Sequence, residues 1–157
     1  MTLLGLIDED FVNYKKVSMV LQFPKCTLKC NKPYGRPICQ NTRLVLEKGM
    51  EIDAEELVMR YLRNPITEAV VMQGLEPFDT YDDLKRFINK FRTATQDDIV
   101  IYTGYNKEEI ADQIAELSQY PNIIIKFGRY VPNQEPHYDE VLGVKLASDN
   151  QYAERIS

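Results

Sequence analysis

Residues 17–30 have the sequence Val17-Ser-Met-Val-Leu-Gln-Phe-Pro-Lys-Cys-Thr-Leu-Lys-Cys30, an apolar run that passes directly into a loop with two cysteines. The run from Val17 to Phe23 is short and apolar and ends at Pro24, so it predicts a buried strand. The third cysteine follows in the same loop. We therefore expect the first strand of the fold to carry the chain straight into its chemical site.

All three cysteines of the chain, Cys26, Cys30 and Cys39, lie within fourteen positions of this loop, which also contains proline and glycine. An odd number of clustered cysteines favours a metal site over a disulfide framework. Three thiolates fill three corners of a four-iron cluster and leave one iron free to bind substrate directly. Two alternatives stay open. The cysteines are buried hydrophobes or reduced thiols, or they bind zinc together with His137, the only histidine.

Length and composition limit the classes of protein to consider. The chain has 157 residues, 44% of them hydrophobic, so we expect a single domain, residues 1–157, with its own core. A net charge of −5 argues against nucleic acid or an anionic membrane as the main partner. The first seven residues run into Asp8, Glu9 and Asp10, unlike a signal peptide, and no stretch approaches the roughly twenty apolar residues of a membrane span. These features predict a cytoplasmic protein.

Strand and helix signals alternate along the chain in the order β-α-β-α-β-α-β. Asp53 is a candidate N-cap for a helix that Pro65 ends, and Thr80 with Asp83 resembles a capping box. Short buried strands that alternate with helices predict an α/β fold with a mostly parallel sheet and right-handed crossovers. The expected strands cover residues 17–23, 68–73, 99–103 and 122–127, and the expected helices cover residues 53–63, 80–91 and 107–117.

Three loops of unusual composition follow the ends of successive expected strands. They are the cysteine loop, the turn Gln73-Gly-Leu-Glu-Pro-Phe78 and the segment Thr103-Gly-Tyr105. Each loop alone also fits a plain structural role, such as a strand-ending turn. Functional groups in parallel sheets gather at the carboxyl ends of the strands, so the three loops together predict one shared site.

These motifs together resemble the radical S-adenosylmethionine (SAM) enzymes. The likeness is greatest to the small activating proteins of anaerobic, class III ribonucleoside-triphosphate reductases. It rests on the cysteine loop, on Gly74-Leu-Glu-Pro77, on Tyr102-Thr-Gly-Tyr105 and on the closing segment Ala147-Ser-Asp-Asn-Gln-Tyr-Ala-Glu-Arg-Ile156. The resemblance implies a partial (β/α) barrel with alternating helices, open along one side where a partner closes the site.

The resemblance also assigns residues to cofactors. Cys26, Cys30 and Cys39 would hold a [4Fe-4S] cluster whose open iron chelates SAM. The turn after the second strand would receive the methionine ammonium, and the position before the last cysteine would lie near the adenine. Polar residues after the third strand and near the carboxyl terminus would meet the ribose or the carboxylate. The expected SAM-binding residues are Ile38, Gly74, Leu75, Glu76, Thr103, Ser148 and Asn150.

The activity implied by the resemblance is reductive cleavage of SAM to a 5′-deoxyadenosyl radical. That radical would take a hydrogen atom from a glycine of a large glycyl-radical reductase, the expected partner. A flavodoxin or a ferredoxin would supply the electron. The protein would bind, orient and exclude water and oxygen, and none of its own acids or bases is needed as a catalyst.

The chain departs from the family in its cysteine spacing, which is Cys-x3-Cys-x8-Cys in place of Cys-x3-Cys-x2-Cys. The extra segment, residues 31–37, would reshape the mouth of the site at a small cost in loop closure. This insertion favours a second hypothesis, a radical SAM enzyme with another substrate. A third hypothesis, of a different class, is a non-catalytic zinc-binding interaction module. The polar segment 128–138 is expected to be either a docking or covering loop or a plain surface connection.

Overall fold

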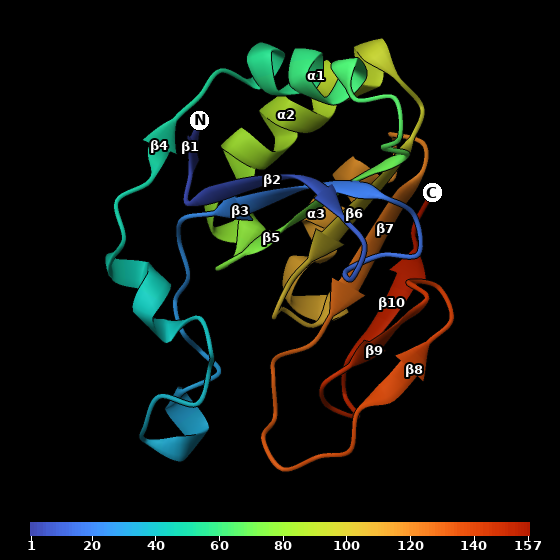
Figure 1. Ribbon diagram of the computed structural model, residues 1–157. Coiled ribbons are helices and arrows are strands. Elements are labelled where there is room, and N and C mark those ends of the chain that lie inside the picture. The colour runs from blue at the N-terminus through green and yellow to red at the C-terminus, as the bar shows by residue number, and fades with distance from the viewer.

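The computed structural model describes all residues, 1–157, and its centre is a six-stranded mixed sheet (Figure 1). The strand order is β10-β7-β6-β5-β3-β2, and the four central strands run parallel. The two edge strands, β2 and β10, pair antiparallel with their neighbours. The strands are β2 (Gly5–Asp10), β3 (Ser18–Phe23), β5 (Ala69–Gly74), β6 (Asp98–Tyr102), β7 (Ile123–Phe127) and β10 (Tyr152–Arg155).

The predicted α/β class and the mostly parallel sheet are thereby confirmed. All four predicted strands are present, because continuous apolar runs are typical of strands buried on both faces. The edge strands were missed: β2 is half acidic, and β10 is polar and pairs along one side only. The sheet is open and ends at these two strands, so the partial barrel stays a prediction.

Three α-helices connect the parallel strands: α1 (Ala54–Arg63), α2 (Tyr81–Ala94) and α3 (Ala111–Leu117). Asp53 caps α1 as predicted, and its side chain accepts the backbone N–H of Glu55 at 2.7 Å. Such a cap stabilises a helix by about 1 kcal/mol.

The helix starts after β5 and β6 contain short 3-10 turns that the sequence analysis did not predict. The predicted capping box at Thr80 is wrong, because Thr80 makes no side-chain cap bond at the start of α2. A 3-10 turn, η3 (Pro77–Thr80), precedes α2 and is capped by Glu76. A second turn, η4 (Lys107–Ile110), leads into α3. Proline at the start of η3 fits a first helical position, where no N–H is needed.

The side chains of the sheet divide between two cores, as the alternation along a strand requires. On β5, Val70 and Met72 pack against the helices, whereas Ala69 and Val71 pack on the opposite face. The helix side holds 22 buried residues and the other side nine, so the helices cover the larger core. Burial of each large apolar side chain stabilises the fold by roughly 1.5–3 kcal/mol.

The remaining elements are short. β1 (Thr2–Leu3) pairs with β4 (Met50–Glu51), and β8 (His137–Asp139) forms a hairpin with β9 (Val144–Leu146). The long connection from β3 to β4 hangs away from the sheet and contains only the 3-10 turns η1 (Lys32–Tyr34) and η2 (Thr42–Leu46) (Figure 1). No helix in the structure combines the length and the apolar character of a membrane span.

Candidate metal centre

The three cysteines lie in one pocket at the carboxyl ends of the parallel strands. We call it the cysteine pocket. Its walls come from the loops after β3, β5 and β6, the three that the sequence predicted to share a site, and from the loop after β7, which adds Arg129. The residues that line it are Cys26, Thr27, Lys29, Cys30, Cys39, Leu75, Glu76, Gly104, Tyr105 and Arg129.

A tight turn folds the loop between the first two cysteines. Leu28 has a φ of 52°, in the left-handed region that is uncommon for a residue with a side chain. Its backbone N–H donates a hydrogen bond to Cys26 Sγ at 3.2 Å, and its carbonyl accepts the N–H of Asn31 at 3.0 Å. This turn brings Cys26 and Cys30 to the same pocket.

One side chain closes the inserted segment before the third cysteine. Asn31 Oδ1 accepts the backbone N–H of Ile38 at 2.9 Å and that of Cys39 at 3.2 Å. Asn31 Nδ2 donates to Thr42 Oγ1 at 3.3 Å. Residues 32–37 therefore project outward as a closed loop, and Cys39 returns to the pocket beside Cys30.

The cysteine loop is tied to the neighbouring strand-end loops on two sides. Asp79 accepts the backbone N–H of Thr27 at 3.0 Å and the hydroxyl of Tyr105 at 2.6 Å. Lys29 Nζ lies 4.8 Å from the centre of the Tyr105 ring and 3.8 Å from Glu109 Oε1. These contacts hold the thiols at fixed positions over the ends of β5 and β6.

The donor set fits an iron-sulfur cluster better than a single metal ion. The three thiols form no disulfide, and each is half-buried. No three Cys, His, Asp or Glu side chains converge closely enough to hold one ion. His137 does not line the pocket, because it pairs with Leu146 in the β8–β9 hairpin. The thiolates of a four-iron cluster each bind a different iron, so the cluster requires sulfurs that are spread around a cavity.

Without a metal the thiols of Cys26 and Cys30 stay protonated at neutral pH, because their pKa values are raised. Burial raises the pKa of the Cys26 thiol to about 11. Burial also raises the pKa of the Cys30 thiol, and the neighbouring Cys39 raises it further. Metal ligands must be deprotonated, so binding releases protons and its affinity rises with pH.

The family described as a 4Fe-4S single cluster domain matches residues 14–151 of this sequence. The chain belongs to this 4Fe-4S single cluster domain family. It is therefore an iron-sulfur protein, and Cys26, Cys30 and Cys39 are the thiols that its pocket offers to the cluster. No curated protein and no solved structure matches the chain.

Glu76 lines this 4Fe-4S pocket and is only 4% exposed. Its carboxylate accepts the backbone N–H of Phe78 at 3.2 Å, the hydroxyl of Thr103 at 2.8 Å and the N–H of Gly104 at 2.9 Å. Burial raises the pKa of Glu76 to about 7, although the three hydrogen bonds act in the opposite direction. A carboxylate has about four acceptor positions, so one is left for a ligand.

A second, larger recess adjoins the cluster pocket and shares Cys30, Cys39, Leu75 and Gly104 with it. This strand-end pocket has a volume of about 350 Å³, within the range of small-molecule sites. Its other lining residues are Gln22, Asn41, Leu44, Gln73, Gly74, Tyr102, Thr103, Lys126, Gly128, Tyr130 and Gln151.

The turn after β5 borders both pockets, as predicted. Gly74 has a φ of 109°, and a Cβ there would lie 2.7 Å from the backbone nitrogen of Phe23. Only glycine fits this close approach of β5 to β3. Leu75 follows Gly74 and lines both pockets. Its backbone N–H donates a hydrogen bond to the Phe23 carbonyl at 3.1 Å.

Lys126 is a residue of the strand-end pocket that the sequence analysis missed. It is 7% exposed, and Nζ donates one hydrogen bond, to the carbonyl of Gly128 at 2.9 Å. Burial lowers the pKa of Lys126 to about 8, while Glu76 acts to raise it. The expected strand at residues 122–127 contains this lysine, and the signal that could have identified it is that an ammonium is almost never buried without a partner.

Three predicted SAM-binding residues line neither pocket. Ile38 lies at the base of the projecting loop, next to Cys39, where its backbone N–H is bound by Asn31. Ser148 is fully buried, and its hydroxyl accepts the N–H of Val131 at 3.2 Å. Asn150 is exposed, and its side chain donates to the carbonyl of Arg129 at 2.8 Å. The carboxyl-terminal segment thus contacts the loop after β7. Its residue Gln151 lines the strand-end pocket.

Proposed function

We propose that this protein is a radical SAM enzyme that cleaves SAM reductively. The observation that carries the proposal is that Cys30 and Cys39 line both the cluster pocket and the strand-end pocket. A ligand in the larger recess therefore lies against the cluster site. With three cysteines in the chain, one iron of a four-iron cluster has no thiolate of this protein and is open to that ligand.

The walls of the strand-end pocket suit the amino-acid end of SAM. Lys126 has two N–H donors without a partner in the protein, which a carboxylate would accept. The acceptor positions of the Gly74–Glu76 turn suit an ammonium group. Lys126 and Glu76 are both buried, so their interactions with the carboxylate and the ammonium group of SAM are stronger than they would be in water.

The cluster, when bound, supplies the electron that breaks the sulfur–C5′ bond of SAM. The protein's own residues hold the thiols, orient the methionine end and keep water from the recess. Thr103 positions Glu76, because its hydroxyl donates a hydrogen bond to that carboxylate. No proton transfer by a side chain is required.

We propose a glycine of a large anaerobic ribonucleotide reductase as the source of the hydrogen atom, and a flavodoxin or ferredoxin as the electron donor. The support is the likeness of the three strand-end motifs and the closing segment to the activating proteins. A second candidate is a radical SAM enzyme with another substrate. The projecting loop of residues 32–37 favours it, because the usual family spacing has no room for such a loop.

The decisive experiment is anaerobic reconstitution with iron and sulfide, then reduction with dithionite in the presence of SAM. Chromatography should detect 5′-deoxyadenosine, and the product should vanish in Cys26→Ala, Cys30→Ala and Cys39→Ala. His137→Ala is the matched control and should keep both cluster and product. A protein that takes up one zinc ion, depends on His137 and forms no product would overturn the proposal.

A further inference from the structure

The connection that carries the cysteines has a charge opposite to that of the rest of the chain. Residues 25–48, which we call the basic arm, contain six Lys or Arg residues and one Glu, a net charge of +5. The whole chain carries −5, so the remaining residues carry −10. The cations of the basic arm are Lys25, Lys29, Lys32, Arg36, Arg43 and Lys48.

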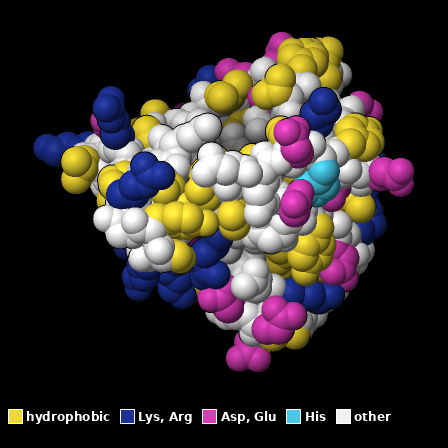
Figure 2. Space-filling model, turned by 90° about the horizontal axis from the view of Figure 1, so that it is seen from below, with side chains coloured by type: hydrophobic (Ala, Val, Ile, Leu, Met, Phe, Trp, Pro, Cys, Tyr) yellow, Lys and Arg dark blue, Asp and Glu magenta, His cyan; other side chains and the backbone are white.

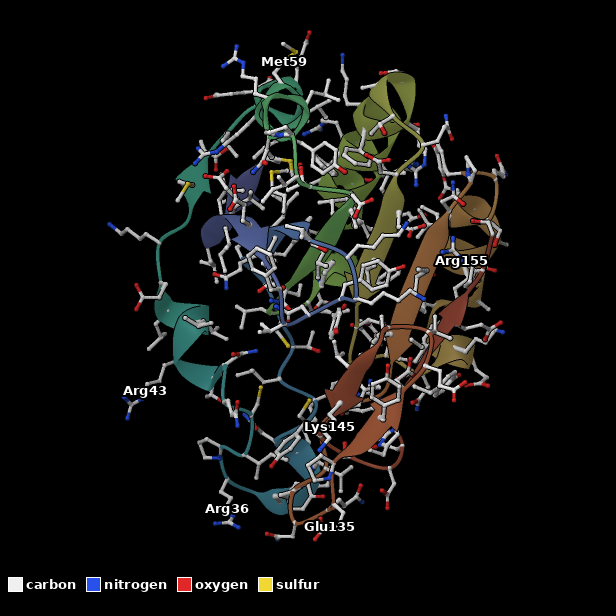
Figure 3. The ribbon with its side chains drawn as sticks, turned by 45° about the vertical axis from the view of Figure 1, so that its right-hand side comes forward. Arg36, Arg43, Met59, Glu135, Lys145 and Arg155 are labelled. Atoms are coloured by element: carbon white, nitrogen blue, oxygen red, sulfur yellow. The ribbon has the colours of Figure 1, made fainter.

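Nearly all of these cations are unpaired. Lys29 alone reaches a carboxylate, and the other five are exposed and form no ion pair. Figure 2 shows Lys and Arg side chains gathered on the side where the arm projects, with most Asp and Glu on the other side. In Figure 3, Arg36 and Arg43 point away from the sheet into solvent. Five positive charges of the arm are thus exposed to solvent without an ion-pair partner in this molecule.

Apolar side chains are interspersed among these charges. Leu46 is 89% exposed, and Tyr34 and Val45 are also exposed on the arm. An exposed apolar group within a charged rim is the composition of a protein interface, where cations steer the partner and apolar contacts hold it.

The arm also borders a second opening, beside the first cysteine. Cys26 lines a shallow outer depression with Pro24, Lys25, Thr27, Val45 and Asp79. Cys26 does not line the strand-end pocket, whereas Cys30 and Cys39 do. Cys26 therefore offers an approach to the cluster site that does not pass through the strand-end pocket.

We propose that the basic arm docks an acidic redox protein, which passes one electron to the cluster from the Cys26 side. The proposal rests on the proposed function, because only a redox-active cluster needs such a donor. One electron leaves the reduced cofactor of the donor and enters the cluster, and no bond forms or breaks in this chain. A donor at the Cys26 depression would leave the strand-end pocket free for SAM.

The first test is binding of an acidic flavodoxin to the cluster-free protein, measured by calorimetry at low ionic strength. The variant Arg36→Glu/Arg43→Glu should bind at least tenfold more weakly than the wild type. Salt of about 1 M, with a Debye length of about 3 Å, should abolish wild-type binding. The control Lys15→Glu/Arg63→Glu makes the same change in charge at exposed positions that precede β3 and β5, at the opposite end of the sheet. Its affinity should stay within twofold of the wild type.

The second test follows reduction of the reconstituted cluster by absorbance, without SAM. Reduction by the flavodoxin should be at least tenfold slower in Arg36→Glu/Arg43→Glu, and reduction by dithionite should be unchanged. This measurement stands even if the protein forms no 5′-deoxyadenosine, so failure of the proposed function is seen separately.

Three results would overturn the inference. The first is equal flavodoxin binding by the arm variant and the wild type. The second is an equal loss in the Lys15→Glu/Arg63→Glu control, which would show a general charge effect. The third is an arm that binds only nucleic acid or a second copy of this chain, detected as a charge-dependent shift with DNA or as self-association in sedimentation.

Discussion

The side-chain oxygen of Asn31 accepts the backbone N–H of Cys39 at 3.2 Å, across the base of a loop of seven intervening residues. The same oxygen accepts the N–H of Ile38 at 2.9 Å. Through these bonds Cys39, which follows Cys30 after eight intervening residues, reaches the pocket of Cys26 and Cys30. The Cys-x8-Cys spacing is therefore compatible with one pocket for all three thiols.

We expect Asn31→Ala to lower the retention of the cluster. It removes the acceptor of two backbone N–H groups, each worth about 1 kcal/mol, and frees the backbone next to Cys39. The iron and sulfide content after gel filtration should fall at least severalfold, with the far-UV circular dichroism unchanged. Asn31→Asp keeps the acceptor oxygen and should retain most of the cluster. Equal cluster content in all three proteins would contradict this role.

Lys126→Met should weaken SAM binding by about tenfold or more, because a hydrogen bond to a charged group contributes about 1.5–3 kcal/mol. Binding of 5′-methylthioadenosine, which lacks the amino acid group, should be unaffected. Equilibrium dialysis against the reconstituted protein measures both ligands. Lys145→Met, at an exposed position of β9, is the control and should bind both normally. A parallel loss of both ligands in Lys126→Met would indicate a collapsed pocket instead.

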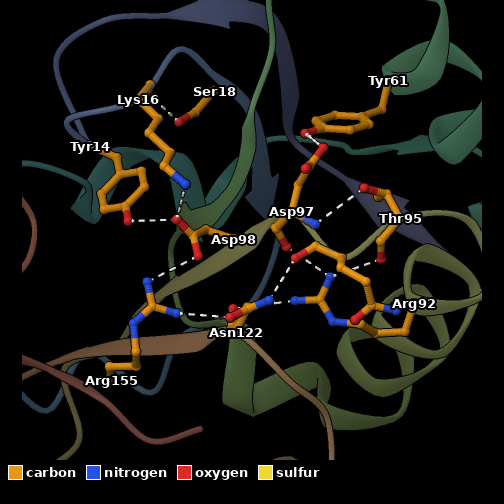
Figure 4. A network of polar contacts seen from close by, with 11 residues as sticks. Tyr14, Lys16, Ser18, Tyr61, Arg92, Thr95, Asp97, Asp98, Asn122 and Arg155 are labelled. Carbon is orange, nitrogen blue, oxygen red and sulfur yellow. Dashed lines mark hydrogen bonds and ion pairs between the residues drawn. The ribbon is translucent and has the colours of Figure 1, made fainter.

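Asp98 anchors a polar network at the amino-terminal end of β6, far along the strand from the cluster pocket (Figure 4). It accepts contacts from Lys16 at 2.6 Å, Tyr14 at 2.9 Å and Arg155 at 3.0 Å. Burial raises the pKa of Asp98, but these hydrogen bonds outweigh burial and hold the pKa below its usual value of 3.8. The ionised form is thus stabilised in the folded state.

We expect Asp98→Asn to lower the free energy of unfolding by about 2 kcal/mol at pH 7, because Asp98 is buried but Lys16 and Arg155 are partly exposed and solvent screens their charges. A depressed pKa stabilises the fold above the unfolded value near 3.8, and this stability is lost as pH falls through the folded pKa. The difference between variant and wild type should therefore shrink in acid below that value. Urea unfolding at several pH values measures it. Glu135→Gln, in an exposed loop, should show no difference at any pH.

Ser148→Ala should destabilise the protein by about 1 kcal/mol and leave the affinity for SAM unchanged. Its hydroxyl is the acceptor for the N–H of Val131, and Ser148 lines neither pocket. Thermal unfolding and SAM dialysis on the same preparation separate the two effects. A large loss of SAM affinity with normal stability would restore the direct role that the resemblance assigned to this serine.

Much of the fold could be predicted because its strong signals are local. Val70, Val71 and Met72 form a run that only a fully buried strand accommodates. Asp53 precedes an amphipathic helix and caps it. The edge strands β2 and β10 gave no such signal, because an edge strand needs apolar residues on one face alone. Glu76 as the cap of η3 also escaped prediction, since its placement depends on the donors of Thr103 and Gly104.

The sequence by itself determined the alternation of parallel strands and helices along the chain. It also determined that the three thiols cluster and that they follow the first parallel strand. Those properties follow from hydrophobic periodicity and from covalent order. Only the tertiary structure decided that Lys126 lines the strand-end pocket and that Ser148 and Asn150 do not. It also decided that Cys26 lines a separate depression. The physical reason is that these positions depend on register and burial across strands far apart in the chain, where a change of one residue moves a side chain to the other face.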